Sequence, residues 1–497
     1  MLDVTAPADL TWLVWFAAGA MAFMAWGIGA NDVANSFGTA FGAKAITARQ
    51  AVAIAAVCEL AGAVLMGASV ASTIRKGMMD VDQYAGEDGR TLMMAGMTSV
   101  LVASGTWLLA ASKMGLPVST THSAVGGVVA FAIASKGWGS VKWGKVGLIV
   151  ASWVISPVMS GIVGYMTYWL LQRFVLSADD VLARAKVAAP CIVFLLGLVV
   201  SFFTIYKGGK GIGLDDIETG VAIIVSIGIA LFLALVSVPV VKWWIGRTVA
   251  IKGDGHNLAS PTPSPPAAAG RSRNLGDDEV KRTLGAELDN AEIGLKIPAE
   301  PVDDVERLFQ GFVVIVSAFM SLAHGANDVA NSVGPFGAVL AAYEGELGDK
   351  TEIDVWVFLV AGFMICVGLG TYGYYVMQTI GSKVTPLDAK KAFCANWAAT
   401  LVILIATWVG IPVSTTHASV GAVMGVGMVG GKENVDWAIM IKIFTSWIVT
   451  LPICALAMAG VFAFLLPCVV DVPFETYNAS CVSQTTCSTE WANYTLP

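Results

Sequence analysis

The feature that most constrains the fold of this chain is a series of apolar runs of about 20 residues, which recur along the sequence. Charged residues make up only 13% of the chain, about half the share usual in soluble domains. Backbone polar groups within a bilayer must bond to one another, so such runs form helices. The sequence therefore predicts an all-α polytopic membrane protein. It excludes a soluble enzyme, a disordered chain and a disulfide-built secreted domain.

Charged or Gly/Pro-rich breaks divide the apolar sequence into about twelve segments. These segments divide the chain into residues 1–245, a linker at 246–308, residues 309–467 and a polar tail at 468–497. The proline-containing linker is typical of a solvated tether, with room for an amphipathic helix around 277–293. The segments fall near 11–38, 50–71, 92–111, 116–135, 146–171, 187–206, 219–243, 309–341, 355–379, 392–410, 412–430 and 437–467.

The distribution of basic residues predicts the orientation in the membrane. No Lys or Arg occurs in residues 1–43 or after Lys442, which places both termini outside the cell and the linker in the cytoplasm. The tail carries glycosylation sequons at Asn478 and Asn493 and a close pair of cysteines, Cys481 and Cys487. These features indicate a glycosylated multi-pass protein of the plasma membrane. The chain has no basic face that would bind nucleic acid.

Two strings occur twice in the same order. GANDVANS occupies Gly29–Ser36 and Gly325–Ser332, and PVSTTH occupies Pro117–His122 and Pro412–His417. Seven apolar segments precede the second GANDVANS, so the two copies should cross the membrane in opposite directions. Inverted-topology repeats are a signature of secondary transporters, whose substrate site lies near mid-membrane where the repeats meet.

The GANDVANS strings place carboxylates within apolar sequence. A carboxylate at the centre of a membrane helix costs about 2.5–3.5 kcal/mol, and such residues are usually functional. The alternative is that these polar residues only join neighbouring helices. Glycines beside the strings favour close helix approach or a helix break. The polar residues that can converge from the two copies are Asn31, Asp32 and Asn35, and Asn327, Asp328 and Asn331.

The PVSTTH strings are suited to helix N-termini. Proline cannot continue a helix but fits its first turn, and Ser or Thr is a natural N-cap. A helix that starts within the membrane would aim its positive end at an anion. The alternative is a plain Ser/Thr-rich helix junction. The residues concerned are Ser119, Thr120 and Thr121, and Ser414, Thr415 and Thr416.

The segments that carry these strings contain no fixed cation. No Lys or Arg lies in residues 1–43, 114–135, 308–349 or 392–431. Helix dipoles supply only about half a charge each, so an anion beside two carboxylates would need bound cations. Carboxylate, amide and hydroxyl oxygens suit a hard ion, most simply sodium. We expect co-transported sodium ions and no organic cofactor.

A few further polar residues are candidates. His122 and His417 could carry protons or could bond a neighbour to hold the loop. His324 stands where the first copy has Ile28, which makes it a candidate gate or relay, or a residue that only bonds its neighbours. Glu59 is a lone carboxylate in the second segment and should be functional or ion-paired. Gln378 is a weaker candidate.

At these residues the chain resembles the inorganic phosphate transporter family, the sodium–phosphate symporters that carry GANDVANS twice, of eukaryotic type. The resemblance covers about residues 11–243 and 309–467. It implies phosphate uptake coupled to sodium by alternating access, inverted repeats and a possible homodimer. It implies phosphate contacts at Asn31, Asp32, Ser119, Thr120, Thr121, Asn327, Asp328, Ser414, Thr415 and Thr416. It implies sodium contacts at Asn31, Asp32, Asn35, Asn327, Asp328, Asn331, Ser119 and Ser414.

The chain departs from the resemblance at one place. Animal members have a second glutamate where this chain has Asn396, so the resemblance does not carry over one coupling-ion or exchange role at this position. Proton coupling, or transport of sulfate, stays an alternative within the same fold. An intramembrane hydrolase that uses Ser119 or Ser414 with a nearby histidine is a distant alternative. Duplicated sites on opposed repeats speak against it, because catalysis needs one nucleophile.

Overall fold

A computed structural model describes residues 10–207, 217–253, 303–347, 353–382 and 384–469. Within these residues the chain is helical, apart from an isolated β-bridge between Met79 and Val141. Among the described residues, ten helices are long and apolar enough to cross a membrane. Two shorter helices, α5 (Thr120–Lys136) and α13 (Thr415–Met428), complete the twelve segments expected from the sequence.

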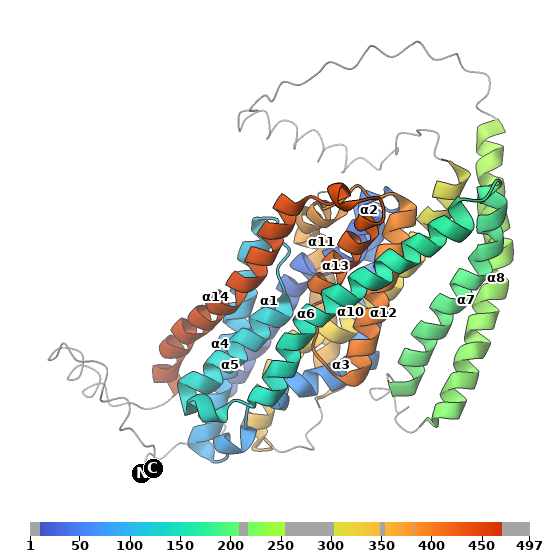
Figure 1. Ribbon diagram of the computed structural model, residues 1–497. Helices are drawn as coiled ribbons and strands as arrows, with labels where there is room; N and C mark the ends of the chain where they lie inside the picture. The colour runs from blue at the N-terminus through green and yellow to red at the C-terminus, as the bar shows by residue number, and fades with distance from the viewer. Residues whose placement is uncertain (1–9, 208–216, 254–302, 348–352, 383, 470–497) are drawn as a thin grey trace, which may run out of the picture.

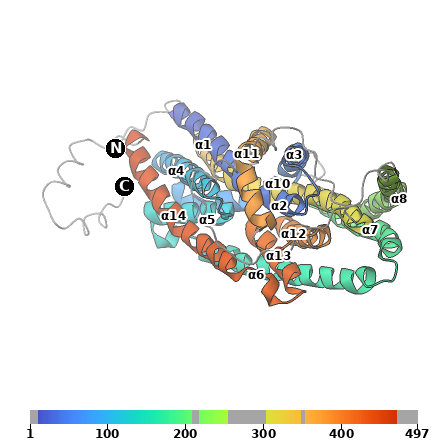
Figure 2. The same cartoon turned by 90° about the horizontal axis from the view of Figure 1, so that it is seen from above.

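The remaining helices form two sets of matching order. In the sequence, one set precedes a pair of helices and the other follows it. The first set comprises α1 (Thr11–Asn31), α2 (Ala34–Gly42), α3 (Ala48–Ser72), α4 (Glu87–Lys113) and α6 (Trp143–Leu171). The second comprises α10 (Asp304–Glu344), α11 (Val355–Ser382), α12 (Ala389–Val409) and α14 (Trp437–Val469). The pair between them is α7 (Val181–Lys207) and α8 (Thr219–Gly253), which stands at the edge of the bundle (Figures 1 and 2).

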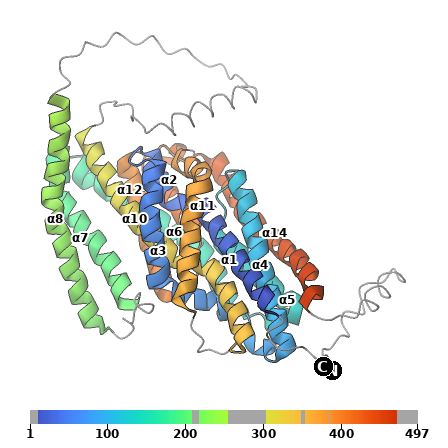
Figure 3. The same ribbon diagram turned by 180° about the vertical axis from the view of Figure 1, so that it is seen from behind.

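The two sets run in opposite directions, as the sequence parity predicts. The start of α1 and the end of α14 lie at one end of the bundle (Figure 3). The end of α8 and the start of α10 lie at the opposite end. The α1–α2 segment and α10, which carry the two GANDVANS strings, therefore cross the bundle in opposite senses. The inverted-repeat architecture is confirmed.

Glycines bring the two repeats into backbone contact. α3 packs against α10, and α11 packs against α1. A Cβ atom built on Gly325 would lie 2.3 Å from the carbonyl oxygen of Glu59, and one on Gly29 would lie 1.8 Å from that of Ile365. Only glycine allows such approach, which is how small residues permit helices to associate in membranes. The close approach predicted for both strings is thus confirmed.

Two expected segments begin later than predicted, and some expected features lie outside the described residues. The segments expected at 116–135 and 412–430 become helical only at Thr120 and Thr415, because prolines and N-cap serines precede them. A helix break occurs at the first GANDVANS, whereas α10 runs unbroken through the second. The amphipathic helix expected at 277–293, the sequons and the tail cysteines lie outside the described residues.

Candidate functional site

The first GANDVANS string forms the junction of two helices. α1 ends at Asn31 and α2 begins at Ala34. Across this junction the N–H of Asn35 bonds to the carbonyl of Asp32 at 2.9 Å, and that of Ser36 to Val33 at 3.0 Å. These are bonds to the third residue back, in place of the α-helical fourth. The Asp32 side chain therefore lies at a break in the helix within the bundle, where it is 1% exposed.

The asparagines of both strings hold the loops that lead into the PVSTTH helices. Asn31 donates from Nδ2 to the carbonyl of Leu116 at 3.0 Å, and its Oδ1 accepts from the N–H of Val118 at 3.0 Å. In the second repeat the side-chain amide of Asn327 lies 3.5 Å from the carbonyl of Ile411, in the loop before α13, and 3.1 Å from Thr407 Oγ1 at the end of α12. Each asparagine thus fixes the chain just before a helix start in its own repeat.

The PVSTTH strings begin helices within the bundle, as predicted. Ser119 is the N-cap of α5, and its Oγ accepts from the N–H of His122 at 3.3 Å. Ser414 caps α13 in the same way, with the N–H of His417 at 3.2 Å. The first four N–H groups of a helix lack partners within it, and each cap satisfies one of them. Both helices therefore point a positive end at the place where the strings meet.

Threonine hydroxyls join the helix starts to the carboxylates. Thr120 donates to Asp32, and Thr415 donates to Asp328 at 2.8 Å. Thr416, from the second repeat, also donates to Asp32 Oδ1 at 3.1 Å. Side chains from both repeats therefore contact the first aspartate directly.

Contacts across the two repeats come in matching pairs. Thr416 Oγ1 lies 3.1 Å from the carbonyl of Val118, and Thr121 donates to the carbonyl of Val413 at 2.9 Å. Asn35 donates to Thr416 at 3.0 Å, and Asn331 contacts Thr121 at 3.5 Å. The four strings thus meet at one place with approximate two-fold symmetry. The structure thus brings the predicted residues of the four strings together.

The site where the four strings meet is suited to bind a cation. Ligand atoms of Asp32, His324 and Asp328 all lie within 4.8 Å of one another, and all three side chains are buried. The Oδ1 atoms of Asn35 and Asn331 are buried without a hydrogen-bond partner. Buried acceptors are nearly always satisfied, so a matched pair of free amide oxygens beside two carboxylates fits a hard cation.

Glu59 and His324, which lie far apart in the sequence, form one pair. His324 Nδ1 lies 2.8 Å from Glu59 Oε2, and His324 Nε2 lies 3.1 Å from Asp328 Oδ2. Ser321 donates to the other Glu59 oxygen at 2.7 Å. The helical spacing of His324 and Asp328 signals the second contact. Nothing in the sequence signals the first contact, because its partners are 265 positions apart in the chain.

The other candidate residues lie around this centre. The imidazoles of His122 and His417 contact the carbonyls of Trp447 and Trp153 at 3.2 and 2.9 Å, which ties each PVSTTH helix to the opposite repeat. The Asn396 amide donates to the carbonyl of Ser36 and to Ser317 Oγ, and its oxygen accepts from Thr39. The side chain of Gln378, in α11, is not among those the structure describes.

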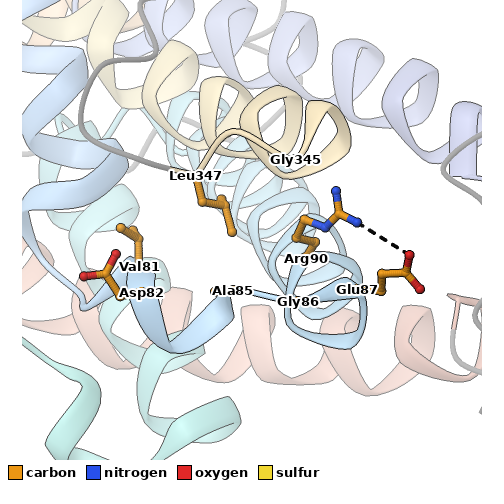
Figure 4. A pocket seen from close by; sticks show the side chains of 8 residues that line it. All are labelled: Val81, Asp82, Ala85, Gly86, Glu87, Arg90, Gly345 and Leu347. Atoms are coloured by element: carbon orange, nitrogen blue, oxygen red, sulfur yellow. Dashed lines mark ion pairs between the residues drawn. The ribbon is translucent and has the colours of Figure 1, made fainter. Parts of the chain in front are cut away.

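A separate pocket of about 370 Å³ lies away from these strings (Figure 4). It is formed by the 3-10 turn Val81–Tyr84, the start of α4 and the end of α10. Arg90 and Glu87 pair across 3.9 Å at its edge. None of the predicted site residues lines it, so this pocket is not the predicted site.

The two repeats run in opposite directions and meet at a buried polar site, and helix starts point into this site. This arrangement defines a secondary transporter. The comparisons with known proteins identify the particular family. A model described as the phosphate transporter family matches residues 28–458, and the chain belongs to this family.

Individual relatives span most of the chain. Inorganic phosphate transporter 2-1, chloroplastic, of Arabidopsis thaliana is 38% identical over 87% of this chain and 68% of its own length. Sodium-dependent phosphate transporter 1-A of Danio rerio is 27% identical over 87% of this chain and 91% of its own. A solved structure titled "The sodium-dependent phosphate transporter" is 31% identical, with a TM-score of 0.75, and covers 92% of this chain and 99% of its own.

Proposed function

We propose that this protein is a symporter that moves inorganic phosphate into the cell with sodium ions by alternating access. The proposal rests on the charges at the site where the four strings meet. Two buried carboxylates lie there, within segments that contain no Lys or Arg. The printed names of the Danio rerio relative and of the solved structure, both sodium-dependent phosphate transporters, support the same coupling.

The proposed phosphate contacts are the starts of α5 and α13. The N–H groups of a first helical turn lack partners within the helix, so those that the caps leave, together with the hydroxyls, can donate to phosphate oxygens. Both threonines that follow each cap donate to a carboxylate or a carbonyl in the described structure, so phosphate would compete for these hydroxyls. The residues are Ser119, Thr120, Thr121, Ser414, Thr415 and Thr416, with the amides of Asn31 and Asn327.

The proposed sodium contacts are the oxygens between the two repeats. Asn35 and Asn331 present free buried Oδ1 atoms. Asp32 and Asp328 present carboxylates within 4.8 Å of each other. Two like charges at about 4 Å repel by about 4 kcal/mol at an effective dielectric of 20. Sodium ions between them would remove that repulsion and let a phosphate anion approach.

We also propose, from the sequence, that both termini and the tail lie outside the cell and that the linker is cytoplasmic. This arrangement agrees with the placement of the α1 start and the α14 end at one end of the bundle. We also predict, from the sequence and the resemblance, that the protein lies in the plasma membrane, that its tail is glycosylated and that it forms a homodimer.

The test is phosphate binding to the purified protein in sodium chloride and in choline chloride at equal ionic strength. We expect at least about tenfold weaker binding in choline, because one missing charge near the site is worth more than 1.4 kcal/mol. Equal affinity would mean that a fixed cation neutralises the anion, and sodium coupling would be wrong.

Proton coupling is a second candidate, favoured by the position of His324 between two carboxylates. Uptake into proteoliposomes separates the two. We expect a sodium gradient to drive labelled phosphate inward, and a proton gradient without sodium to fail. An excess of unlabelled sulfate in the same assay tests the anion, and it should leave phosphate uptake unchanged.

A further inference from the structure

α2 (Ala34–Gly42) is a short helix with a turn on each side. The turn before it is the break at Asp32 and Val33. In the turn after it, Lys44 has a φ of 54°, a left-handed conformation that residues other than glycine rarely adopt. Turns at the ends of an element are where hinge movements take place in proteins. α2 is therefore the part of the first GANDVANS segment that can change direction relative to α1 and α3.

α2 closes one end of the bundle. It lies at the end opposite to the start of α1 and the end of α14 (Figures 1 and 3), which we propose above to be the cytoplasmic end. All its residues from Ala34 to Ala40 are buried. It packs mainly on α11, α10 and α12 of the second repeat, and it has little contact with α1. Because α2 directly follows Asp32, it covers the site where the four strings meet from this end.

One side chain of the second repeat holds α2 in this place. Asn396, in α12, accepts a hydrogen bond from Thr39 Oγ1 at 2.6 Å and donates from Nδ2 to the carbonyl of Ser36 at 3.0 Å. The same Nδ2 donates to Ser317 Oγ of α10 at 2.8 Å. Asn396 is 2% exposed, and both protons of its amide are used. It thus joins two points of α2 to two helices of the other repeat.

The counterparts of these polar side chains in the other half of the repeat are apolar. Spacing from the repeated strings identifies each counterpart: that of Thr39 is Pro335, that of Ser317 is Met21 and that of Asn396 is Leu101. Met21 and Leu101 are buried, and Pro335 lies within α10, which is unbroken there. The segment equivalent to α2 is therefore part of a longer helix and is not tied by this set of hydrogen bonds.

The difference matters when water enters the bundle. A hydrogen bond within the protein that is exchanged for bonds to water changes the free energy only modestly. Separating apolar surfaces exposes them to water at a cost that is proportional to their area. Contacts that break and re-form in every transport cycle are therefore suited to be polar. The bonds to Asn396 lower the cost of opening at the end that α2 closes.

We propose, on the basis of the transport function proposed above, that α2 is the gate at the cytoplasmic end and that Asn396 is the positioning residue that holds it closed. During transport α2 moves on the two turns that bound it, its bonds to Asn396 break, and Asp32 becomes open to the cytoplasm. α10 and α12 stay joined through Asn396 and Ser317. Since the equivalent part of α10 does not move as a separate helix, the two ends of the bundle open by different movements.

The first test joins α2 covalently to α12. Thr39→Cys with Asn396→Cys is treated with a short bifunctional methanethiosulfonate, which bridges two thiols and is released by a reductant. The matched control, Ser317→Cys with Asn396→Cys, joins α10 to α12 and leaves α2 unbridged. Both variants share Asn396→Cys and the native cysteines, so the effects of these are common to both.

The readout is sodium-driven phosphate uptake by proteoliposomes. We expect the bridge to α2 to lower uptake at least about tenfold, with recovery on reduction, because a gate that is held closed blocks every cycle. The control bridge should leave uptake within about twofold of its unbridged value, since α10 and α12 do not separate when the gate opens.

The second test needs neither cysteines nor transport. Hydrogen exchange of backbone N–H groups is measured by mass spectrometry on the native protein and on Thr39→Val, which keeps the size of the side chain and removes the hydroxyl that bonds to Asn396. In the native protein we expect α2 to exchange at least about tenfold faster than the equivalent residues 330–338 of α10, because α2 opens as a unit. Thr39→Val should speed exchange of α2 about threefold or more and leave residues 330–338 unchanged. A merely structural role of Asn396 would change both segments together.

The outcomes separate the gate from the proposed function. Equal inhibition by the two bridges, or full uptake with α2 bridged, would overturn α2 as the gate, while phosphate transport would stand. Exchange of α2 no faster than that of residues 330–338, and unchanged by Thr39→Val, would also overturn it, even if the cysteine variants did not fold. Absence of sodium-driven phosphate uptake by the native protein would overturn the proposed function, and the exchange measurement would then decide whether α2 opens.

Discussion

Replacing Gly29 by alanine tests whether backbone contact between the repeats positions the site. The added Cβ would lie 1.8 Å from the carbonyl oxygen of Ile365, against 3.4 Å for ordinary contact. α11 would have to move by roughly 1.5 Å, since a backbone carbonyl cannot rotate away as a side chain can. Overpacking of this kind costs about 1–3 kcal/mol or more.

The measurements are thermal unfolding in detergent and phosphate uptake by proteoliposomes. We expect Gly29→Ala to lower the melting temperature by roughly 3–6 °C. Because Gly29 lies two residues before the end of α1, uptake should fall at least about tenfold, as misplacement by about 1 Å typically does. Gly19→Ala is the matched control in the same helix, since a Cβ there meets nothing within 4 Å.

The control should be as stable as the native protein or more stable, because alanine favours a helix by about 1 kcal/mol over glycine. If Gly29→Ala melted and transported like Gly19→Ala, the two helices would not be in backbone contact at this point. The backbone contact by which α11 positions the end of α1 would then be wrong.

Three further predictions concern single side chains and the tail. Asp32→Asn should abolish sodium-driven uptake but leave the melting temperature within a few degrees, and near-normal uptake would exclude Asp32 from the site. Asn396→Leu removes three buried hydrogen bonds and should destabilise the protein by about 2–4 kcal/mol, measured by unfolding; an unchanged midpoint would contradict this. Asn478 should carry a glycan in a eukaryotic membrane, and a tag after Pro497 should be labelled on intact cells; labelling only after permeabilisation would reverse the orientation.

Repetition in the sequence was sufficient to predict the architecture. The second GANDVANS string follows seven apolar segments, an odd number, so the two identical strings had to run in opposite directions, and the structure has them so. The caps at Ser119 and Ser414 were predictable as well, because proline and serine have strong local preferences at helix starts.

Features that depend on pairing between distant helices could not be predicted. The identical GANDVANS strings give a break in one repeat and a continuous helix in the other, so the surrounding helices decide between the two. The partner of His324 comes from α3, and only the packing of α3 on α10 brings Glu59 to it. From the sequence alone, Glu59 and His324 could be recognised only as polar residues within apolar segments.

The contacts that cross between the repeats have a consequence for biosynthesis. Asp32 receives a hydrogen bond from Thr416, which is synthesised 384 residues later. At about 5–20 residues per second, that interval lasts roughly 20–80 s. During this time the first repeat lacks the polar contacts that the second repeat supplies to its buried centre. A chain that ended between the halves would keep the hydrogen bond from Thr120 to Asp32 and would lack the one from Thr416.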